Sequence, residues 1–375
     1  MISLPQKLRR MIPCVFIDMP AWDHPALVSA NTFLSEENAA TLLSRRAFHR
    51  SMAALLLSAA FPPFSFSGNR TTSVALLLSG VITDGGWGQL AYNGLTTLKS
   101  RGFRTAYAEN ISLAQMDQVV RGYSDDGFDL VIGHGGEFSS TVLEVAPDYP
   151  RQRFFVTTFL PQADISRNLM YVNMGYFGAA YGAGVLAALI SEKKQAVGFI
   201  GGADDPNQQR MKKAFIAGAQ HAVPGIRAMG IITGDYDNAS KGREAASILI
   251  GNGADVIWHS ADITGLGAIQ GAVAGHIKVL GCYSDQTALA PNNMATSFEM
   301  NLAGMVITIA EKVASGTFTG GIEWRPPVDE MWLLRNGPNR NYNPHLITTA
   351  EWAAFQNVWR DVAARKIDVS QFAGS

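Results

Sequence analysis

From residue 73 onward, short apolar runs alternate with segments whose apolar residues recur at helical spacing. Residues 73–79 read SVALLLS and end at Gly80, which is typical of a strand buried on both faces. From Trp87 to Leu98 the apolar side chains then recur every three or four positions. This spacing predicts a helix with one apolar face.

The same alternation continues through two successive halves of the chain. In the first half we expect further strands at 104–108, 129–133 and 153–158, with helices at 112–124 and 138–146. In the second half we expect strands at 196–200, 226–233, 255–259 and 278–282, with helices at 208–221 and 241–252. A strand–helix–strand order of this kind favours parallel sheets with right-handed crossovers.

We therefore predict an α/β protein of two Rossmann-like lobes with a ligand cleft between them. The first lobe comprises residues 71–175 with a return segment near 296–318, and the second comprises 176–295. Residues 170–173 and a Gly/Ala-rich helix at 176–190 form the crossover, and the C-terminal segment 319–375 packs across both lobes. Such α/β units bind ligands at the carboxyl ends of their strands.

The first seventy residues have a different pattern. Arg45 and Arg46 precede Phe48 and a short apolar run at 52–61, the layout of a twin-arginine export signal. The run is too short for a membrane span of about 20 residues. We expect 44–70 to be a signal peptide and the protein to be periplasmic, although a flexible basic linker remains the alternative. Residues 1–43, interrupted by prolines, are expected to be unstructured or to precede the true start.

Charge and cysteine content exclude several functions. The 30 basic and 31 acidic residues leave a net charge of −1, so no basic surface for nucleic acid is expected. Only Cys14 and Cys282 are present, without a Cys/His cluster, which argues against a structural zinc site or a disulfide framework. The chain has no GxGxxG, GxxxxGK[ST], GxSxG or HExxH motif. We expect no cofactor and no metal.

Carboxylates and amides beside aromatic residues recur at the predicted strand ends. The candidate ligand-binding residues are Asp84, Trp87, Gln89, Gly135, Glu137, Trp258, Asp262 and Asp285. A flat heteroaromatic ligand could stack on Trp87, and base–aromatic stacking contributes about 1–3 kcal/mol. Asp84 and Asp285 could accept hydrogen bonds from ring N–H groups or sugar hydroxyls.

Each candidate also has a structural alternative. Asp84 could cap the helix that follows it, and Trp87 and Trp258 could pack in a core, which for Trp258 is the favoured interpretation. Asp262 and Asp285 could be turn or cap residues. The strand-end histidines His134 and His259 have no second metal-ligating neighbour and are expected to be structural.

The ordered series of motifs resembles the basic membrane protein (BMP) family of purine-nucleoside-binding components of bacterial ABC importers. The matching stretches are 84–94 (DGGWGQLAYNG), 180–188 (AYGAGVLAA), 197–202 (VGFIGG), 252–257 (NGADVI) and 281–286 (GCYSDQ). The resemblance implies a type I periplasmic-binding-protein fold that closes on a purine nucleoside. It also implies that Trp87 takes the place of a stacking Phe and Asp285 that of an Asp that holds the ribose.

Several positions depart from the family pattern. Gly88 replaces a hydrogen-bonding Asn, and Thr158 and Phe159 stand where an Asp commonly follows the fourth strand. Glu299 and Met300 stand where a Lys reaches the sugar. A free nucleobase therefore remains an alternative to a nucleoside. No Cys follows the apolar signal run, so we expect a soluble protein rather than a lipid-anchored one.

Taken together, these patterns favour a monomeric solute-binding protein that delivers its ligand to ABC permease subunits in the membrane, and not an enzyme. Two alternatives remain. A hydrolase acting on nucleosides could use the acids at the strand ends. A ligand-sensing module could use the same fold, although the N-terminal extension has no helix-turn-helix pattern.

Overall fold

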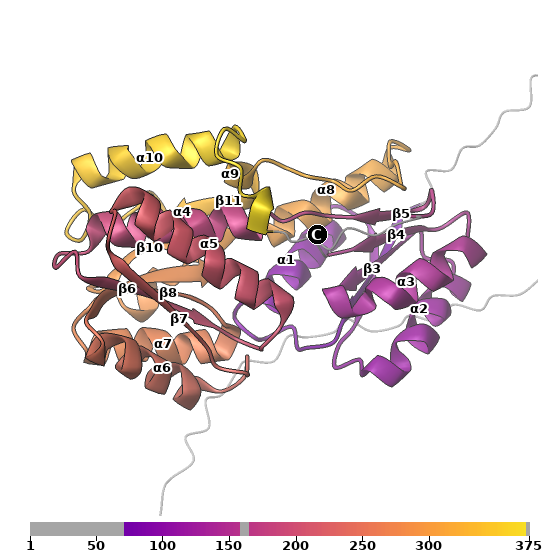
Figure 1. Ribbon diagram of the computed structural model, residues 1–375. Helices are drawn as coiled ribbons and strands as arrows, with labels where there is room; N and C mark the ends of the chain where they lie inside the picture. Colours follow the sequence, from indigo (N-terminus) through magenta and orange to yellow (C-terminus); the bar gives the residue numbers. More distant parts are fainter. Residues whose placement is uncertain (1–70, 158–164, 373–375) are drawn as a thin grey trace, which may run out of the picture. The chain divides into compact units, whose positions relative to one another are not determined.

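Two sheets with helices on both faces make up the fold (Figure 1). The computed structural model describes residues 71–157 and 165–372, and both sheets belong to one compact unit. The predicted extension and signal segment, together with Thr158 and Phe159, lie outside the described residues.

The first sheet is parallel throughout and has the strand order β2-β1-β3-β4-β5. Its strands are β1 Ser73–Leu78, β2 Arg104–Ala108, β3 Leu130–His134, β4 Arg153–Val156 and β5 Leu169–Tyr171. Alternate residues of β1 face opposite ways: Leu76 packs in the same cluster as the helix residue Leu95, whereas Leu77 packs in the same cluster as Val120. A strand covered by helices on both sides must be apolar at every position, which explains its unbroken apolar run.

The second sheet has the strand order β11-β10-β9-β8-β6-β7. Its strands are β6 Ala196–Gly201, β7 Arg227–Ile232, β8 Ala254–Ser260, β9 Lys278–Tyr283, β10 Met294–Met300 and β11 Trp332–Arg335. The β10–β11 pair is antiparallel, and the other strand pairs of this sheet are parallel.

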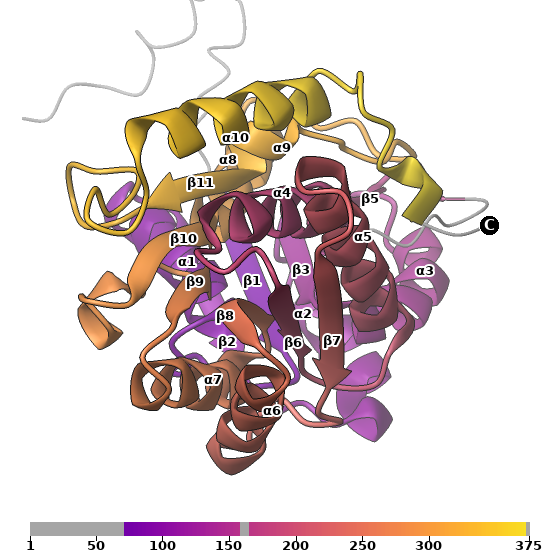
Figure 2. The same cartoon turned by 60° about the vertical axis from the view of Figure 1, so that its left-hand side comes forward.

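Helices cover both faces of each sheet. They are α1 Trp87–Ser100, α2 Met116–Asp125, α3 Ser139–Val145, α4 Tyr176–Ile190, α5 Pro206–Ala222, α6 Ala239–Gly251, α7 Asp262–Ala274, α8 Leu302–Ala314, α9 Val328–Met331 and α10 Thr349–Ala363. In the second lobe α4, α5 and α10 lie on one side of the sheet and α6 and α7 on the other (Figure 2). The small residues of α4 let it approach α5 closely, because a Cβ atom at Gly184 would lie 2.0 Å from the carbonyl oxygen of Phe215.

The two-lobed α/β fold predicted from the sequence is confirmed, and the expected strands coincide with β1 to β4 and β6 to β9 within a few residues. One element differs from the expectation. The segment predicted as crossover at 170–173 overlaps β5, whose three residues pair with β4 at the edge of the first sheet. The run is so short that its apolar character did not identify a strand.

The chain passes between the sheets at three places. It leaves β5 for α4, which packs against α5 and β8. It returns from β10 of the second sheet to α8, which packs against α1 beside the first sheet. The third passage follows a bridge between Val172 and Trp324 and leads through α9 to β11. These three passages are where a change in the angle between the lobes would have to be absorbed.

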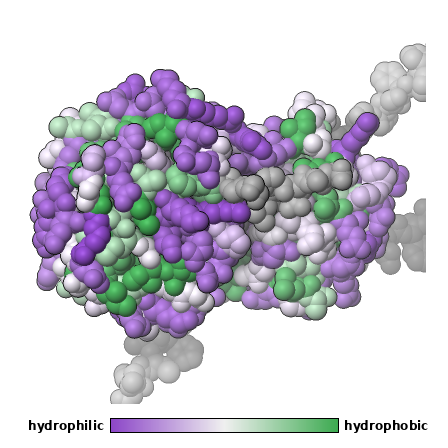
Figure 3. All heavy atoms as spheres, viewed as in Figure 1, coloured by the Kyte–Doolittle hydropathy of each residue, from purple (hydrophilic) through white to green (hydrophobic). Residues whose placement is uncertain are grey.

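The surface carries both polar and apolar residues. On the face seen in Figure 3, hydrophobic residues form separate groups between hydrophilic ones. The large hydrophobic side chains that are exposed are Tyr107, Leu113, Ile248, Val273, Leu289 and Ile322. Among the described residues, no helix has the length and apolar character needed to cross a membrane.

Candidate functional site

Trp87 is the centre of an aromatic group to which both sheets contribute. It begins α1, just after β1, and its ring stacks on that of His134 at the end of β3, with centroids 4.3 Å apart and planes 19° apart. Tyr176 at the start of α4 lies 6.5 Å from the Trp87 ring, and Tyr283 at the end of β9 lies 6.4 Å from it. The strand ends of the two lobes thus meet in an aromatic group around Trp87.

The carboxylate of Asp84 is engaged by the loop that precedes α1. One oxygen accepts hydrogen bonds from the backbone N–H groups of Gly86 (2.9 Å) and Gln89 (3.0 Å), and the other accepts from Gly88 (2.6 Å). In the structure Asp84 therefore caps the start of α1, which is the structural alternative given for this residue. A Cβ atom at Gly88 would lie 2.4 Å from the carbonyl oxygen of Val81, so the Asn found here in the family could not fit without moving the loop.

His134 has a structural role in this group. Its Nε2 lies 3.0 Å from the carbonyl oxygen of Trp87, and its Nδ1 lies 2.9 Å from the hydroxyl of Thr157. A carbonyl can only accept, so Nε2 carries the proton, and the Thr157 hydroxyl donates to Nδ1. Burial lowers the pKa of His134 to about 4, so the ring is neutral and holds the Trp87 backbone in place.

Asp262 supplies a buried carboxyl from the second lobe. It is the first residue of α7 and has a left-handed backbone with a φ of 43°. Its Oδ1 is buried and has no hydrogen-bond partner among the described residues. A Cβ atom at Gly86 would lie 3.1 Å from this oxygen, so Asp262 reaches the loop of the opposite lobe.

The environment of Asp262 changes its acidity. Burial, followed by the negative charges of Asp84 and Asp237, raises the pKa of Asp262 to about 7. Near neutral pH the group can therefore either accept or donate a hydrogen bond. A buried polar atom without a partner costs about 1–3 kcal/mol, which a ligand with a suitable polar atom would recover.

A second polar group, which the sequence analysis did not identify, adjoins the aromatic one. The Nε2 of Gln208 donates to the hydroxyls of Tyr236 (3.1 Å) and Ser260 (3.3 Å). The Ser260 hydroxyl lies 2.7 Å from that of Tyr283, and Tyr236 donates to Asp205 at 3.0 Å. The Oε1 of Gln208 is buried without a partner in the described part of the chain, so it is a second free acceptor.

One sequence signal could have indicated this group. Asp205 precedes Pro206 directly after β6, and its side chain caps α5 by accepting from two backbone N–H groups. An Asp-Pro pair after a strand is a typical helix start. It places α5, and with it Gln208, at the same edge of the sheet as Ser260.

The remaining predicted residues lie apart from the aromatic group or in other roles. Glu137 is exposed and accepts a hydrogen bond from the hydroxyl of Ser79, and Gln89 is also exposed. Gly135 is buried, with a φ of 132°, and its N–H donates to Thr157 at 2.8 Å.

For two candidates the structure contains the structural alternative named above. The exposed Asp285 accepts from Thr287 and from the backbone of Gly337 at 3.0 Å, so its carboxylate serves loop structure. Trp258 is fully buried and packs against Phe199, Phe215 and Phe298. It lies inside β8 and faces the helix layer, so it is a core residue. No group of His, Cys, Asp and Glu suited to a metal ion occurs among the described residues.

Comparisons with known proteins show the family to which the chain is similar. The sequence pattern of a family described as "ABC transporter substrate-binding protein PnrA-like" (Bmp) matches residues 71–343. Basic membrane protein A1 of Borrelia garinii is 26% identical over 253 residues, which are 66% of this chain and 74% of that protein. A transcriptional activator protein of Bacillus subtilis is 27% identical over 271 residues, 71% of this chain and 82% of its own. A purine-binding protein of Brucella abortus is 28% identical over 234 residues, 62% of this chain and 63% of its own.

Solved structures show the same fold. A solute-binding protein of an ABC transporter system from Aeropyrum pernix has a TM-score of 0.70 and 19% identity, and the match covers 79% of this chain and 92% of that one. A corresponding protein from Conexibacter woesei has a TM-score of 0.65 and 24% identity, with coverages of 80% and 99%. The fold is the type I periplasmic-binding-protein fold. Because the family pattern spans well over half of the sequence, this chain belongs to the Bmp family of PnrA-like ABC transporter substrate-binding proteins.

Proposed function

We propose that this protein captures a purine, as a nucleobase or a nucleoside, between its two lobes and delivers it to permease subunits in the membrane. The observation that carries the proposal is the aromatic group of Trp87, Tyr176 and Tyr283 beside the buried, unpartnered Oδ1 of Asp262. Aromatic rings bind a flat heterocycle by stacking, and free polar atoms fix its orientation. The similarity to a purine-binding protein of Brucella abortus supports the same ligand class.

The surroundings of the expected ribose position favour the base over the sugar as the recognised part. Asp285 accepts hydrogen bonds from Thr287 and from the backbone of Gly337, and Glu299 pairs with Arg335 at 3.4 Å. Met300 is buried in the core. Neither the Asp nor the Lys position of the family therefore offers a free charged group to sugar hydroxyls. We expect a free base to bind at least as tightly as its nucleoside.

Calorimetric titration of the purified protein with adenine, hypoxanthine and guanine, and with the corresponding nucleosides, tests this proposal. Ribose alone serves as the control for sugar binding. Purine binding with unchanged ligand recovered afterwards is the expected result. Failure of all six purines to bind would overturn the ligand class, whereas conversion of a nucleoside to base and sugar would identify a hydrolase.

We also propose that the protein is exported by the twin-arginine route and acts as a soluble monomer in the periplasm. The support is the sequence of residues 44–70, in which the arginine pair precedes a short apolar run. Size-exclusion chromatography with light scattering tests the monomer, and the export route has its own test below.

A further inference from the structure

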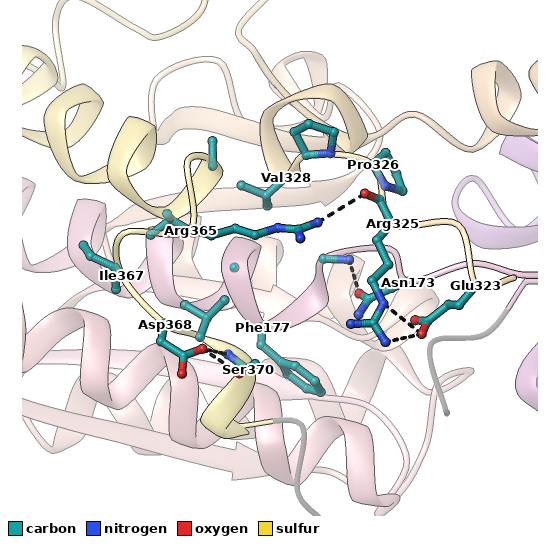
Figure 4. A pocket seen from close by; sticks show the side chains of 16 residues that line it. Asn173, Phe177, Glu323, Arg325, Pro326, Val328, Arg365, Ile367, Asp368 and Ser370 are labelled. Carbon is teal, nitrogen blue, oxygen red and sulfur yellow. Dashed lines mark hydrogen bonds and ion pairs between the residues drawn. The ribbon is translucent and has the colours of Figure 1, made fainter. Parts of the chain in front are cut away.

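A cavity of about 360 Å³ lies apart from the aromatic group, beside two of the passages between the sheets. Asn173 and Gly175, in the passage from β5 to α4, form one part of its wall, and the segment from Glu323 to Val328 forms another (Figure 4). The end of α10 and the residues that follow it complete the lining. At about 30 Å³ per water molecule, the cavity has the volume of roughly twelve waters, which is within the range of small-molecule sites.

Apolar side chains make up much of the wall. They come from four separate segments: Phe177 in α4, Pro326, Pro327 and Val328, Val362 and Ala363 in α10, and Ile367 and Val369 near the C-terminus. An occupant with an apolar body would therefore remove apolar surface from water on several sides. The arrangement favours a compact ring or a branched chain over a polar ligand.

The charged residues of the lining are not equivalent. The carboxylate of Glu323 accepts hydrogen bonds from the guanidinium of Arg325, with the Nε atom at 2.9 Å. Asp368 accepts from the backbone N–H of Ser370 at 2.8 Å and from its hydroxyl at 2.6 Å. Arg325 is thus neutralised by its neighbour, and one oxygen of Asp368 already takes two hydrogen bonds.

Arg365 is the cation that lacks such a partner. Its guanidinium extends across the cavity and makes one long hydrogen bond, 3.4 Å, to the carbonyl oxygen of Arg325 (Figure 4). No ion pair of Arg365 occurs among the residues that the structure describes. Its backbone has a φ of 57° just after α10, a conformation that favours Gly at this position.

We propose that this cavity is a second ligand site, and that it binds a small monocarboxylate with an apolar ring or branched chain. Arg365 would hold the carboxylate by the paired N–H geometry that guanidinium groups offer. The apolar walls would cover the body of the ligand. The cavity is distinct from the site proposed for the purine, because none of its lining residues belongs to the aromatic group around Trp87.

A matched series of three compounds tests the charge requirement. Phenylacetate, phenylacetamide and 2-phenylethylamine share one ring and differ in the charge at the end of the side chain. Ligand-observed NMR or calorimetry should detect phenylacetate at millimolar concentration and find the amide and the amine at least about ten-fold weaker. Equal binding of the amine or the amide would overturn the proposal, as would the absence of binding by phenylacetate, 3-phenylpropanoate and 4-methylpentanoate alike.

Variants distinguish the site from the interlobe one. Arg365→Gln should weaken phenylacetate binding at least about ten-fold, and Arg365→Lys should recover part of it, since Lys keeps the charge but not the fork. Trp87→Ala should bind phenylacetate like the wild type. Both Arg365 variants should unfold at the wild-type temperature because this side chain is exposed. Unchanged affinity of Arg365→Gln, or displacement of phenylacetate by adenine, would place the acid elsewhere and refute the assignment.

Discussion

Replacing Asp262 by Asn should stabilise the ligand-free protein at about pH 8 and leave its stability at about pH 4 unchanged. The pKa of Asp262 is raised from 3.8 to about 7. Because the pKa is raised, the folded state binds more protons than the unfolded state between about pH 4 and pH 7. The protonated Asp262 therefore contributes fully to stability below about pH 4, and this contribution is lost as the pH rises through 7. At about 1.4 kcal/mol per tenfold change in acidity, the loss is at most about 4 kcal/mol. The Oδ1 atom of Asp262 is buried but the residue as a whole is only partly buried, and solvent screening at its exposed atoms reduces this figure to about 2 kcal/mol.

Thermal unfolding of wild type and Asp262→Asn across this pH range measures the effect. A difference of about 2 kcal/mol corresponds to a rise of roughly 3 °C in the melting temperature at about pH 8 for a protein of this size. Asp204→Asn is the matched control, because Asp204 is an exposed carboxylate in the same lobe. A difference that does not vary with pH, or an Asn variant that is less stable at about pH 8, would refute the reasoning. The same variant should bind purines more weakly, by about 1.5–3 kcal/mol if the carboxylate accepts a ligand N–H.

Four further outcomes follow from the structure and the sequence. Trp87→Ala should weaken purine binding about five- to 150-fold with a modest loss of stability. The core variant Trp258→Ala should instead lose about 3–5 kcal/mol of stability. Calorimetry and thermal unfolding of both variants separate the two roles. The pKa of His134 is about 4 in the folded protein, so the unfolded chain binds the proton first and the wild type loses stability as the pH falls from about 6.5 to 4. His134→Gln should reduce this loss of stability. Unfolding curves at several pH values measure it. Saturating purine should reduce the radius of gyration in small-angle scattering, and an unchanged profile would argue for a rigid site. Changing Arg45 and Arg46 to Lys should leave unprocessed precursor in the cytoplasm, and normal processing would exclude the twin-arginine route.

Strands buried on both faces were the part of the fold that the sequence predicted best. In β1 every position is buried, and the five residues that follow Ser73 form an unbroken apolar run. The edge strands β5 and β11 have three and four residues and pair with one neighbour each. Their pairing depends on where the chain returns after each passage between the sheets, and no local sequence pattern predicts that position.

Residues of the candidate site were predictable where they directly follow a buried strand, because the direction of the strand fixes where its end lies. Trp87 and Asp262 begin helices after β1 of the first sheet and β8 of the second, and both lie where the strand ends of the two lobes meet. At the end of β9 the left-handed backbone of Tyr283, with a φ of 69°, redirects the chain. Tyr283 consequently faces Trp87, and Asp285 accepts hydrogen bonds from Thr287 and from the backbone of Gly337 after β11. The sequence identified this strand end but could not show which of its residues points inward.

The charges at the meeting point of the lobes bear on how closure depends on a ligand. Asp84 belongs to the first lobe and Asp262 to the second, and the charge of Asp84 contributes to the raised pKa of Asp262. Bringing the lobes together thus opposes two like charges unless Asp262 is protonated or a donor lies against it. The three hydrogen bonds that Asp84 accepts from Gly86 and from the first turn of α1 fix the position of its carboxylate, whereas Asp262 Oδ1 has no partner among the described residues. A purine N–H directed at Asp262 would offset the repulsion between Asp84 and Asp262, as protonation of Asp262 does. Closure without a ligand should therefore weaken above about pH 7, and a ligand with a donor at that position should restore it.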